Sequence, residues 1–190
     1  MKTKLLLLLT FIIYVNTYAQ FGSQQIITTN AVGATSVYAT DIDGDGDMDA
    51  LSSSQDDDKI AWYENTDGQG SFGTQQIITT NADKAVSVYA TDIDGDGDMD
   101  VLSASQYDNK IAWYENTDGQ GNFGSQQIIT TNADYAGSVY ATDIDGDSDM
   151  DVLSASLFDD KIAWYENTDG QGNFGSQQII TTNADGAFSV

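Results

Sequence analysis

The nine residues "DIDGDGDMD" at positions 41–49 place an aspartate at every second position. The same stretch returns as "DIDGDGDMD" at 92–100 and as "DIDGDSDMD" at 143–151. Like charges at this spacing repel one another, so a folded chain gains nothing from them unless something of opposite charge binds. The fixed interval between the three stretches also indicates that the chain is built from repeats.

The repeat is 51 residues long and extends well beyond the aspartates, since Trp62, Trp113 and Trp164 recur at the same interval. It divides the chain into segments. After a signal peptide at 1–19, we expect the lone outer strand of an incomplete blade at 20–35, complete repeats at 36–86, 87–137 and 138–188, and the start of a fourth repeat at 189–190.

Each repeat contains four short runs rich in Val, Ile, Thr, Tyr and Trp, the residues that strands favour. In the second repeat these runs are 87–93, 100–105, 110–116 and 126–132. Four strands in about fifty residues, repeated in tandem, are typical of β-propeller blades. The predicted fold is therefore all-β, with three complete blades of four antiparallel strands. Closed propellers use about four to eight blades, so three form a partial, open propeller.

The third run, "KIAWYEN" at 110–116, is apolar on both faces, with Ile111 and Trp113 on one and Ala112 and Tyr114 on the other. This pattern predicts a sheet held between two neighbouring sheets. We interpret the three tryptophans as core between blades, the alternative being an aromatic platform for a ligand. The segment Gln24–Asn30 repeats the fourth run without the first three, and is expected to be an outer strand.

The N-terminus has the features of a signal peptide. Lys2 and Lys4 precede an apolar run at 5–15, and Thr17 and Ala19 supply small residues before a cleavage point at Gln20. Because a spanning helix needs about twenty apolar residues, we expect a secreted or cell-surface protein with no membrane span after cleavage. An uncleaved anchor or a buried helix is the alternative.

The composition excludes several classes of function. The formal net charge is −24, and the chain has no arginine, histidine or cysteine. Without arginine and with this charge, nucleic acid and anionic membranes are not expected partners. A Ser-His-Asp or Cys-His triad, a His/Cys zinc site and a disulfide framework are all excluded.

Calcium accounts for the aspartates, because Ca²⁺ takes six to eight oxygen ligands from carboxylates, carbonyls and water. In the first loop we expect side-chain ligands at positions 1, 3, 5 and 9, a glycine turn at position 6, and a backbone carbonyl at position 7, whose side chain faces solvent. About one ion per repeat is predicted, and the alternative is three solvated acidic turns. The predicted metal-site residues are Asp41, Asp43, Asp45, Asp47, Asp49, Asp92, Asp94, Asp96, Asp98, Asp100, Asp143, Asp145, Asp147, Asp149 and Asp151.

The stretch "DIDGDGDMDVLSAS" with a downstream "NFG" resembles the FG-GAP or VCBS-type repeat of integrin-α-like β-propellers. The resemblance covers almost all of residues 21–190. It implies Ca²⁺ in the hairpin between the first two strands of each blade, and a role in adhesion, ligand binding or scaffolding outside the cell. The chain departs from the family in lacking proline and in carrying Ser148 at the loop glycine of the third repeat.

We therefore expect a secreted or cell-surface calcium-binding module without catalytic residues, whose partners are an extracellular protein or a polysaccharide. The alternatives are the propeller part of a polysaccharide lyase or hydrolase, a polysaccharide-binding protein, and a structural surface array. Catalysis would fall to the recurring glutamates Glu64, Glu115 and Glu166. Recurrence in every repeat argues against this, because a catalytic site is normally single. Open blade edges offer a route to self-association.

Strand parity separates two faces of the array. The aspartate loops and "NTDGQG" lie on one face and hardly vary, whereas the loops after the second strand and the links between repeats lie on the other and carry most of the variation. Tyr107, Tyr135 and Phe158 are the aromatic residues of this variable face. Exposed aromatics suit sugar stacking or protein contact, so we expect a ligand to bind there. Neutral drift in solvated loops is the alternative.

Overall fold

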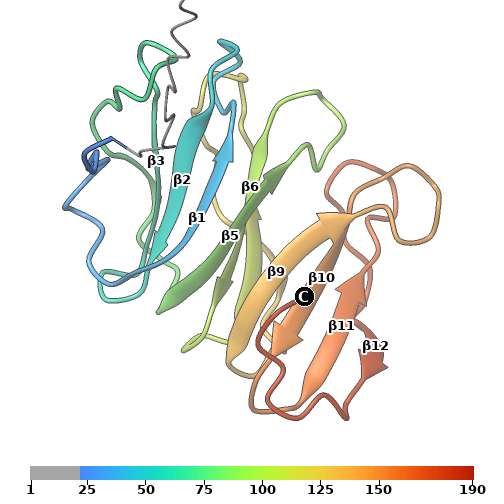
Figure 1. Cartoon of the computed structure of the whole chain (residues 1–190). Helices are drawn as coiled ribbons and strands as arrows, with labels where there is room; N and C mark the ends of the chain where they lie inside the picture. Colours follow the sequence, from blue (N-terminus) through green and yellow to red (C-terminus); the bar gives the residue numbers. More distant parts are fainter. Residues whose placement is uncertain (1–21) are drawn as a thin grey trace, which may run out of the picture.

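The computed structural model describes residues 22–190, which form three four-stranded antiparallel sheets and no helix (Figure 1). The all-β prediction is confirmed. The first sheet consists of β1 (Ala34–Thr40), β2 (Asp49–Ser54), β3 (Lys59–Tyr63) and β4 (Gln76–Thr79). The second consists of β5 (Ala85–Thr91), β6 (Asp100–Ser105), β7 (Lys110–Tyr114) and β8 (Gln127–Thr130). The third consists of β9 (Ala136–Thr142), β10 (Asp151–Ser156), β11 (Lys161–Tyr165) and β12 (Gln178–Thr181).

Within each sheet the strands lie in chain order, and the three sheets stand side by side with β1, β5 and β9 next to one another (Figure 1). The rings of Tyr38, Tyr89 and Tyr140 follow one another across these three strands, tilted by 51° and 54°, with centroids 4.9 and 4.8 Å apart. The sheets do not close on themselves within the described residues. They form the open array of propeller-like blades that the repeat predicts.

Two apolar layers hold the blades together. Leu51, Ile60 and Trp62 of the first blade pack against Val101 and Tyr114 of the second. The equivalent residues form the layer between the second and third blades. Each large side chain buried in this way stabilises the fold by about 1.5–3 kcal/mol. The run "KIAWYEN" is therefore apolar on both faces because, as predicted, its sheet lies between two neighbouring sheets.

Trp62 and Trp113 belong to these layers and are only 2% and 3% exposed. Gly121 and Gly172 of the following blade lie directly on their indole rings, where a larger residue would overlap the ring. Both tryptophans are thus core residues, as predicted, rather than a ligand platform. Trp164 is half-buried, because no further sheet covers the third blade within residues 22–190.

The strand limits differ slightly from the prediction. The run 100–105 coincides with β6, whereas β5 and β9 begin two residues before the predicted starts of the second and third repeats. The sheets therefore span 34–79, 85–130 and 136–181. The third strands end at tyrosine, because the backbone N–H of the following asparagine bonds to an aspartate carboxylate instead of a neighbouring strand.

The prediction of an outer strand at Gln24–Asn30 is wrong, since this segment forms no strand. A strand needs a partner for its backbone groups. Each third strand, β3, β7 and β11, already pairs with the fourth strand of its own sheet. The segment lies instead against the outer face of the first sheet, where it encloses a cavity of about 320 Å³ with Ala50 and Tyr63.

The signal peptide predicted at 1–19 lies outside the described residues. Among residues 22–190, no helix is long and apolar enough to cross a membrane.

Candidate metal centres in the aspartate loops

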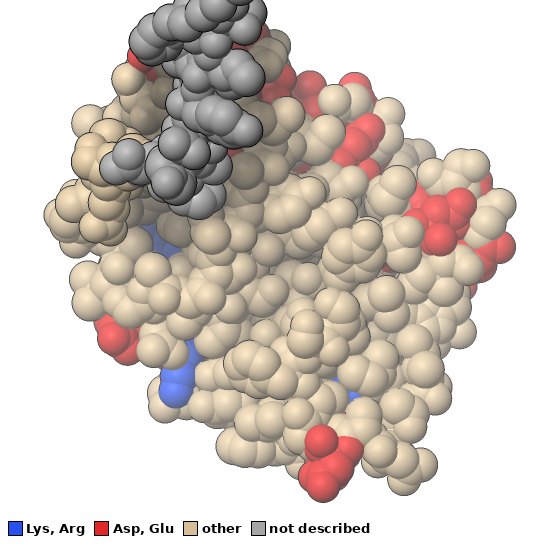
Figure 2. Space-filling model, viewed as in Figure 1, with Lys and Arg blue, Asp and Glu red and all other residues tan. Residues whose placement is uncertain are grey.

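The three aspartate loops connect β1 to β2, β5 to β6 and β9 to β10, at one end of the array. Figure 2 shows acidic side chains gathered at this end, along the upper and right-hand edge of the molecule. The loops after β3, β7 and β11 lie at the same end, since the side chain of Asp47 contacts Gly68. This arrangement confirms the strand parity inferred from the sequence.

Each loop is wrapped around the carboxylate at its first position. In the first loop, Oδ1 of Asp41 accepts a hydrogen bond from the Gly44 N–H at 2.8 Å, and Oδ2 accepts one from the Gly46 N–H at 3.0 Å. Asp92 and Asp143 make the same two bonds. These bonds bend the backbone back over the carboxylate and bring the alternate aspartates together.

Position 6 of the loop requires a left-handed backbone. Gly46 and Gly97 have φ values of 96° and 98°, and Ser148 adopts 84° at the same place. Glycine accepts this conformation without steric conflict, whereas a serine is disfavoured there by about 1 kcal/mol. The predicted turn at this position is confirmed, and the third loop forms it under strain.

Position 9 anchors the loop to the sheet. Asp49 is 1% exposed, and its carboxylate accepts hydrogen bonds from the N–H groups of Ile42 at 2.9 Å and Asn65 at 2.8 Å. Asp100 and Asp151 make the equivalent pairs of bonds. One carboxylate thus joins the aspartate loop to the end of the third strand in every blade.

Three carboxylates converge in each loop, with an oxygen atom from each lying within 4.8 Å of the others. Ligands of one Ca²⁺ ion, each about 2.4 Å from it, lie at most about 4.8 Å apart, so these carboxylates are close enough together to share one ion. The donors are all oxygens, as a hard cation requires. The residues present therefore fit calcium. The three clusters are Asp41, Asp43 and Asp49; Asp92, Asp94 and Asp96; and Asp143, Asp145 and Asp151.

Some predicted ligands lie outside these clusters. Position 5 of the first and third loops, Asp45 and Asp147, does not converge with the other three carboxylates, and neither does Asp100 in the second loop. Asp45 accepts a hydrogen bond from the N–H of Asp47 at 2.8 Å and Asp147 accepts one from Asp149 at 2.9 Å, as the converging Asp96 does from Asp98 at 2.9 Å.

The prediction that the side chain at position 7 faces solvent is wrong. Asp47, Asp98 and Asp149 are half-buried against Gly68, Gly119 and Gly170 of the adjacent loop. Any side chain at those glycines would overlap the carboxylate. The glycine of "TDG" is thus matched to the aspartate loop, a contact between residues too far apart in sequence for strand patterns to predict.

Burial and the clustered charges raise the pKa of several of these carboxyls. Burial raises the pKa of Asp100 to about 7, against the opposing effect of its two backbone hydrogen bonds. Burial, and then the charge of Asp49, raises the pKa of Asp43. A cation bound among these groups would remove the electrostatic penalty of ionising them.

The glutamate and the asparagine that follow each third strand also belong to these centres, and they were not predicted to lie there. The charges of Glu64 and Glu115 contribute to the raised pKa values of Asp43 and Asp94, so both glutamates lie near the loops. Asn116 donates a hydrogen bond across the blade boundary to the carbonyl of Ile42. The available signal was the recurrence of "EN" directly after every third strand.

The predicted ligand residues of the variable face lie at the opposite end. The loop after β6 is bonded to the link before β5 through the Gln106 N–H and the carbonyl of Lys84. Tyr107, Tyr135 and Phe158 meet there, with the centroids of Tyr107 and Tyr135 6.1 Å apart and those of Tyr135 and Phe158 4.3 Å apart. The prediction that they share a face is confirmed.

Comparison with known proteins agrees with this geometry. The model of the FG-GAP-like repeat matches residues 41–103 and 92–154, each match running from one aspartate loop into the next. No curated protein matches the chain.

Two solved structures are similar to this one. A lectin of Agrocybe aegerita, described as recognising non-reducing terminal N-acetylglucosamine, is 19% identical with a TM-score of 0.58, over 79% of this chain and 39% of the lectin. The biofilm matrix protein Bap1 of V. cholerae is 21% identical with a TM-score of 0.38, over 81% of this chain and 29% of Bap1. The chain thus spans well under half the length of either protein.

Proposed function

Because the chain belongs to the FG-GAP-like repeat family, we propose that it is an exported calcium-binding propeller module that attaches to an extracellular protein or polysaccharide. The observation that carries the proposal is the threefold convergence of carboxylate oxygens within 4.8 Å, each time in the loop between the first two strands of a blade. Its recurrence in three blades supports an ion in each loop, since like charges held this close repel one another until a cation offsets them.

In each proposed site the chain's own residues have three separate roles. The converging carboxylates hold the ion, the left-handed residue at position 6 shapes the loop, and the buried aspartate at position 9 ties it to the third strand. Bound calcium supplies positive charge that offsets the clustered carboxylates. Binding to the folded state alone stabilises it by about 2.7 kcal/mol per site when free Ca²⁺ exceeds Kd a hundredfold.

The proposed role is attachment rather than catalysis. The glutamates recur at the same place in every blade, as the aspartate loops do: Glu64, Glu115 and Glu166. This recurrence fits a structural role in each blade rather than a single active centre. The lectin with a similar fold recognises a sugar, and this supports a polysaccharide among the proposed ligands. Export is supported by the apolar run and small residues at 5–19.

Calcium binding can be tested by isothermal titration of the purified, calcium-free protein with Ca²⁺ and with Mg²⁺. We expect three Ca²⁺ ions per chain and weaker binding of Mg²⁺, which demands a tighter octahedral site. The double substitution Asp94→Asn with Asp96→Asn should reduce the number of ions to two. Asp83→Asn removes a charge at the other end of the molecule and should leave three.

An attachment test follows from the same preparations. The protein is applied to an array of glycans and extracellular proteins in calcium and again in chelator. We expect binding that is strongest in calcium, when the blades are fully ordered. A protein that binds no calcium, with melting curves identical in calcium and chelator, would contradict the calcium sites.

A further inference from the structure

Four side chains on the variable face form one continuous cluster, which we call the aromatic patch: Lys84, Tyr107, Tyr135 and Phe158. The rings of Tyr135 and Phe158 are stacked, with centroids 4.3 Å apart and an angle of 28°. The Lys84 ammonium lies 4.4 Å from the centroid of Tyr107 and donates hydrogen bonds to the hydroxyls of Tyr107 at 3.0 Å and Tyr135 at 3.2 Å. The patch therefore spans the second and third blades.

The patch leaves much of its aromatic surface in contact with water. Tyr107 is 62% exposed and Phe158 is 65% exposed. Aromatic rings carry a large apolar area, and their exposure together in one place is a feature of binding surfaces. A packing role would have buried them, as it buries the tryptophans of the blade layers.

The backbone under the patch is strained. Lys84 and Tyr135 have φ values of 58° and 59°, in the left-handed region that favours glycine. The equivalent positions one repeat before and one repeat after are Gly33 and Gly186, both with φ of 66°. Glycine is therefore replaced only at the two copies that contribute side chains to the patch. Strain retained in this way points to function.

The patch is built once, unlike the aspartate loops. The residue equivalent to Tyr107 and Phe158 in the first blade is Asp56. Lys84 and Tyr135 likewise have no counterpart side chain at Gly33 or Gly186. In repeats that are otherwise nearly identical, the differences thus fall on the residues that meet in space. A single site is what a ligand-binding surface requires.

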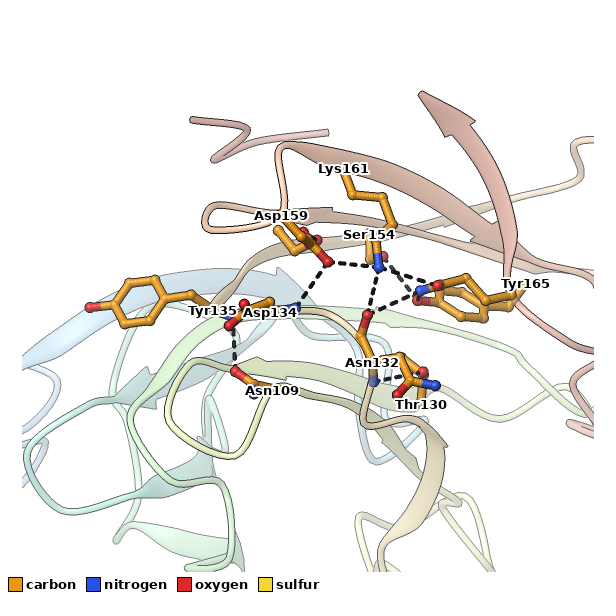
Figure 3. Close-up of polar contacts among 11 residues, drawn as sticks. Asn109, Thr130, Asn132, Asp134, Tyr135, Ser154, Asp159, Lys161 and Tyr165 are labelled. Carbon is orange, nitrogen blue, oxygen red and sulfur yellow. Dashed lines mark hydrogen bonds and ion pairs between the residues drawn. The ribbon is translucent and has the colours of Figure 1, made fainter. Parts of the chain in front are cut away.

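Polar contacts fix the backbone that carries Tyr135 (Figure 3). Its N–H donates to Oδ1 of Asn109 at 2.9 Å, in the loop of the second blade. On the other side, Lys161 of the third blade donates to the carbonyl of Asn132 at 2.8 Å and pairs with Asp159 at 2.7 Å. Figure 3 shows the Tyr135 side chain pointing away from this network. The ring is therefore held in place before any ligand arrives.

Lys84 differs from the other lysines of the described chain. Lys59, Lys110 and Lys161 each pair with an aspartate at 2.7 Å. Within residues 22–190, Lys84 makes no ion pair and bonds instead to two neutral hydroxyls. Its hydrogen bonds to Tyr107 and Tyr135 raise its pKa, so it stays charged. The chain is otherwise strongly acidic, with Asp83 and Asp134 exposed beside the patch, so an acidic ligand can place a carboxylate only at Lys84. A positive charge beside exposed rings fits a ligand that has an apolar face and a carboxylate at that point.

From these observations we propose that the aromatic patch binds a carboxylated sugar chain, with pyranose rings on Tyr107, Tyr135 and Phe158 and a uronate carboxylate on Lys84. Sugar rings stack on aromatic faces through their C–H groups, and an ammonium pairs with a carboxylate in a charge-assisted hydrogen bond. The inference rests on the proposed attachment function and names its site and the class of its ligand.

The probe is an oligomer of galacturonic acid, compared with the same oligomer after reduction of its carboxylates to neutral hydroxymethyl groups. In calcium, the purified protein should bind the acidic oligomer at least threefold more tightly than the neutral one. Tyr107→Ala with Phe158→Ala should weaken both at least tenfold. Lys84→Met should abolish the difference between them. Asp56→Ala, at the equivalent position of the first blade, serves as the control and should change neither.

Lys84→Gly provides a readout that a merely structural role would not give. It relieves the left-handed strain, so the melting temperature should rise while the preference for the acidic oligomer is lost. Binding of the acidic oligomer that survives Tyr107→Ala with Phe158→Ala would overturn the patch, and so would equal binding of the two oligomers. Both results leave the attachment function standing. Failure of calcium to alter melting would overturn the calcium sites and leave the patch standing.

Discussion

The side chain of Asn116 in the second blade donates a hydrogen bond to the backbone carbonyl of Ile42 in the first blade, at 2.8 Å and across 74 residues of sequence. Asn167 makes the same bond to the carbonyl of Ile93, also at 2.8 Å. Ile42 and Ile93 are the second residues of aspartate loops. The first and second aspartate loops are thus each bonded to the next blade.

The same asparagine also belongs to its own blade's loop. The backbone N–H of Asn116 donates to Asp100 at 2.8 Å, and its side-chain oxygen accepts from the N–H of Gly121 at 3.1 Å. Gly121 in turn lies on the indole of Trp62. One buried residue therefore links two aspartate loops and the apolar layer between two blades.

We predict that Asn116→Ala destabilises the protein by about 2–3 kcal/mol, because it leaves the Ile42 carbonyl and the Gly121 N–H buried without partners. It should also weaken calcium binding at the first loop. Urea denaturation and calcium titration measure the two effects. Asn65→Ala is the control, because within the described chain the Asn65 side chain bonds only inside its own blade, to the Met48 carbonyl and the Gly70 N–H. Equal losses from the two substitutions would contradict the role of the inter-blade bond.

Local pattern made the strands and their order predictable. Asp100–Ser105 was located to the residue, because the aspartate loop before it and the polar stretch 106–109 after it bound the run. The clustering of carboxylates in each loop was predictable because they belong to one continuous stretch of sequence. The segment 24–30 was mispredicted, because its strand-forming residues were not matched by a free partner.

Contacts between blades escaped prediction. The bond of Asn116 to Ile42 and the packing of Asp47 on Gly68 depend on how loops meet in space. Lys84 lies in a link that varies between repeats, but its contacts with Tyr107 and Tyr135 were not predictable. These two residues are 23 and 51 positions away from it in sequence. The repeat shows which positions are equivalent between blades, but it does not show which residues of different blades are in contact.

The strain at Ser148 yields a prediction about the third loop. Ser148→Gly relieves about 1 kcal/mol of left-handed strain, part of which is offset by the greater freedom of glycine in the unfolded chain. We expect a net gain of about 0.5 kcal/mol in unfolding free energy and tighter calcium binding at one of three sites. Gly97→Ser in the second loop is the matched reverse change and should have the opposite effect. Three sites that titrate alike in both variants would contradict the turn geometry.

The outer faces of the first and third sheets predict self-association. Ile144 is 38% exposed, whereas its equivalent Ile93 is 1% exposed under the next blade. At the other end Val37 is 71% exposed, while Val88 is 5% exposed in the layer between blades. The exposed parts of the two faces carry residues that pack together inside the chain, while the segment 24–30 lies over Ala50 and Tyr63 of the first sheet. A second copy can therefore add head to tail, in a contact that continues from copy to copy.

Sedimentation at increasing protein concentration measures this association. Ile144→Lys and Val37→Lys should each shift the protein toward monomer, since they place a charge on either partner face. Ile128→Lys is the control, because Ile128 is 58% exposed on an outer strand and its equivalents in the other blades are equally exposed. A monomer that persists at about 100 μM, or an effect of Ile128→Lys equal to that of Ile144→Lys, would contradict the head-to-tail contact.

The raised pKa values predict that calcium reverses the effect of pH on stability. Asp100 has a pKa of about 7 in the folded protein, raised from 3.8 chiefly by burial. Between about pH 4 and 7 the calcium-free folded state therefore binds more protons than the unfolded chain, and its unfolding free energy falls as pH rises. Burial also raises the pKa of Asp43 and Asp94, which act in the same direction.

Under the proposed function, calcium binds the ionised carboxylates and protons compete with the ion, so in calcium the stability should rise over the same pH range. Melting temperatures at pH 5.0 and 7.5 measure both slopes. In chelator the protein should melt at a lower temperature at pH 7.5 than at pH 5.0, and in millimolar Ca²⁺ the order should be reversed. Asp100→Asn should flatten the slope in chelator, because it removes the carboxyl whose pKa burial raises to about 7. Slopes of the same sign in both conditions would show that the ion and the protons do not share these aspartates.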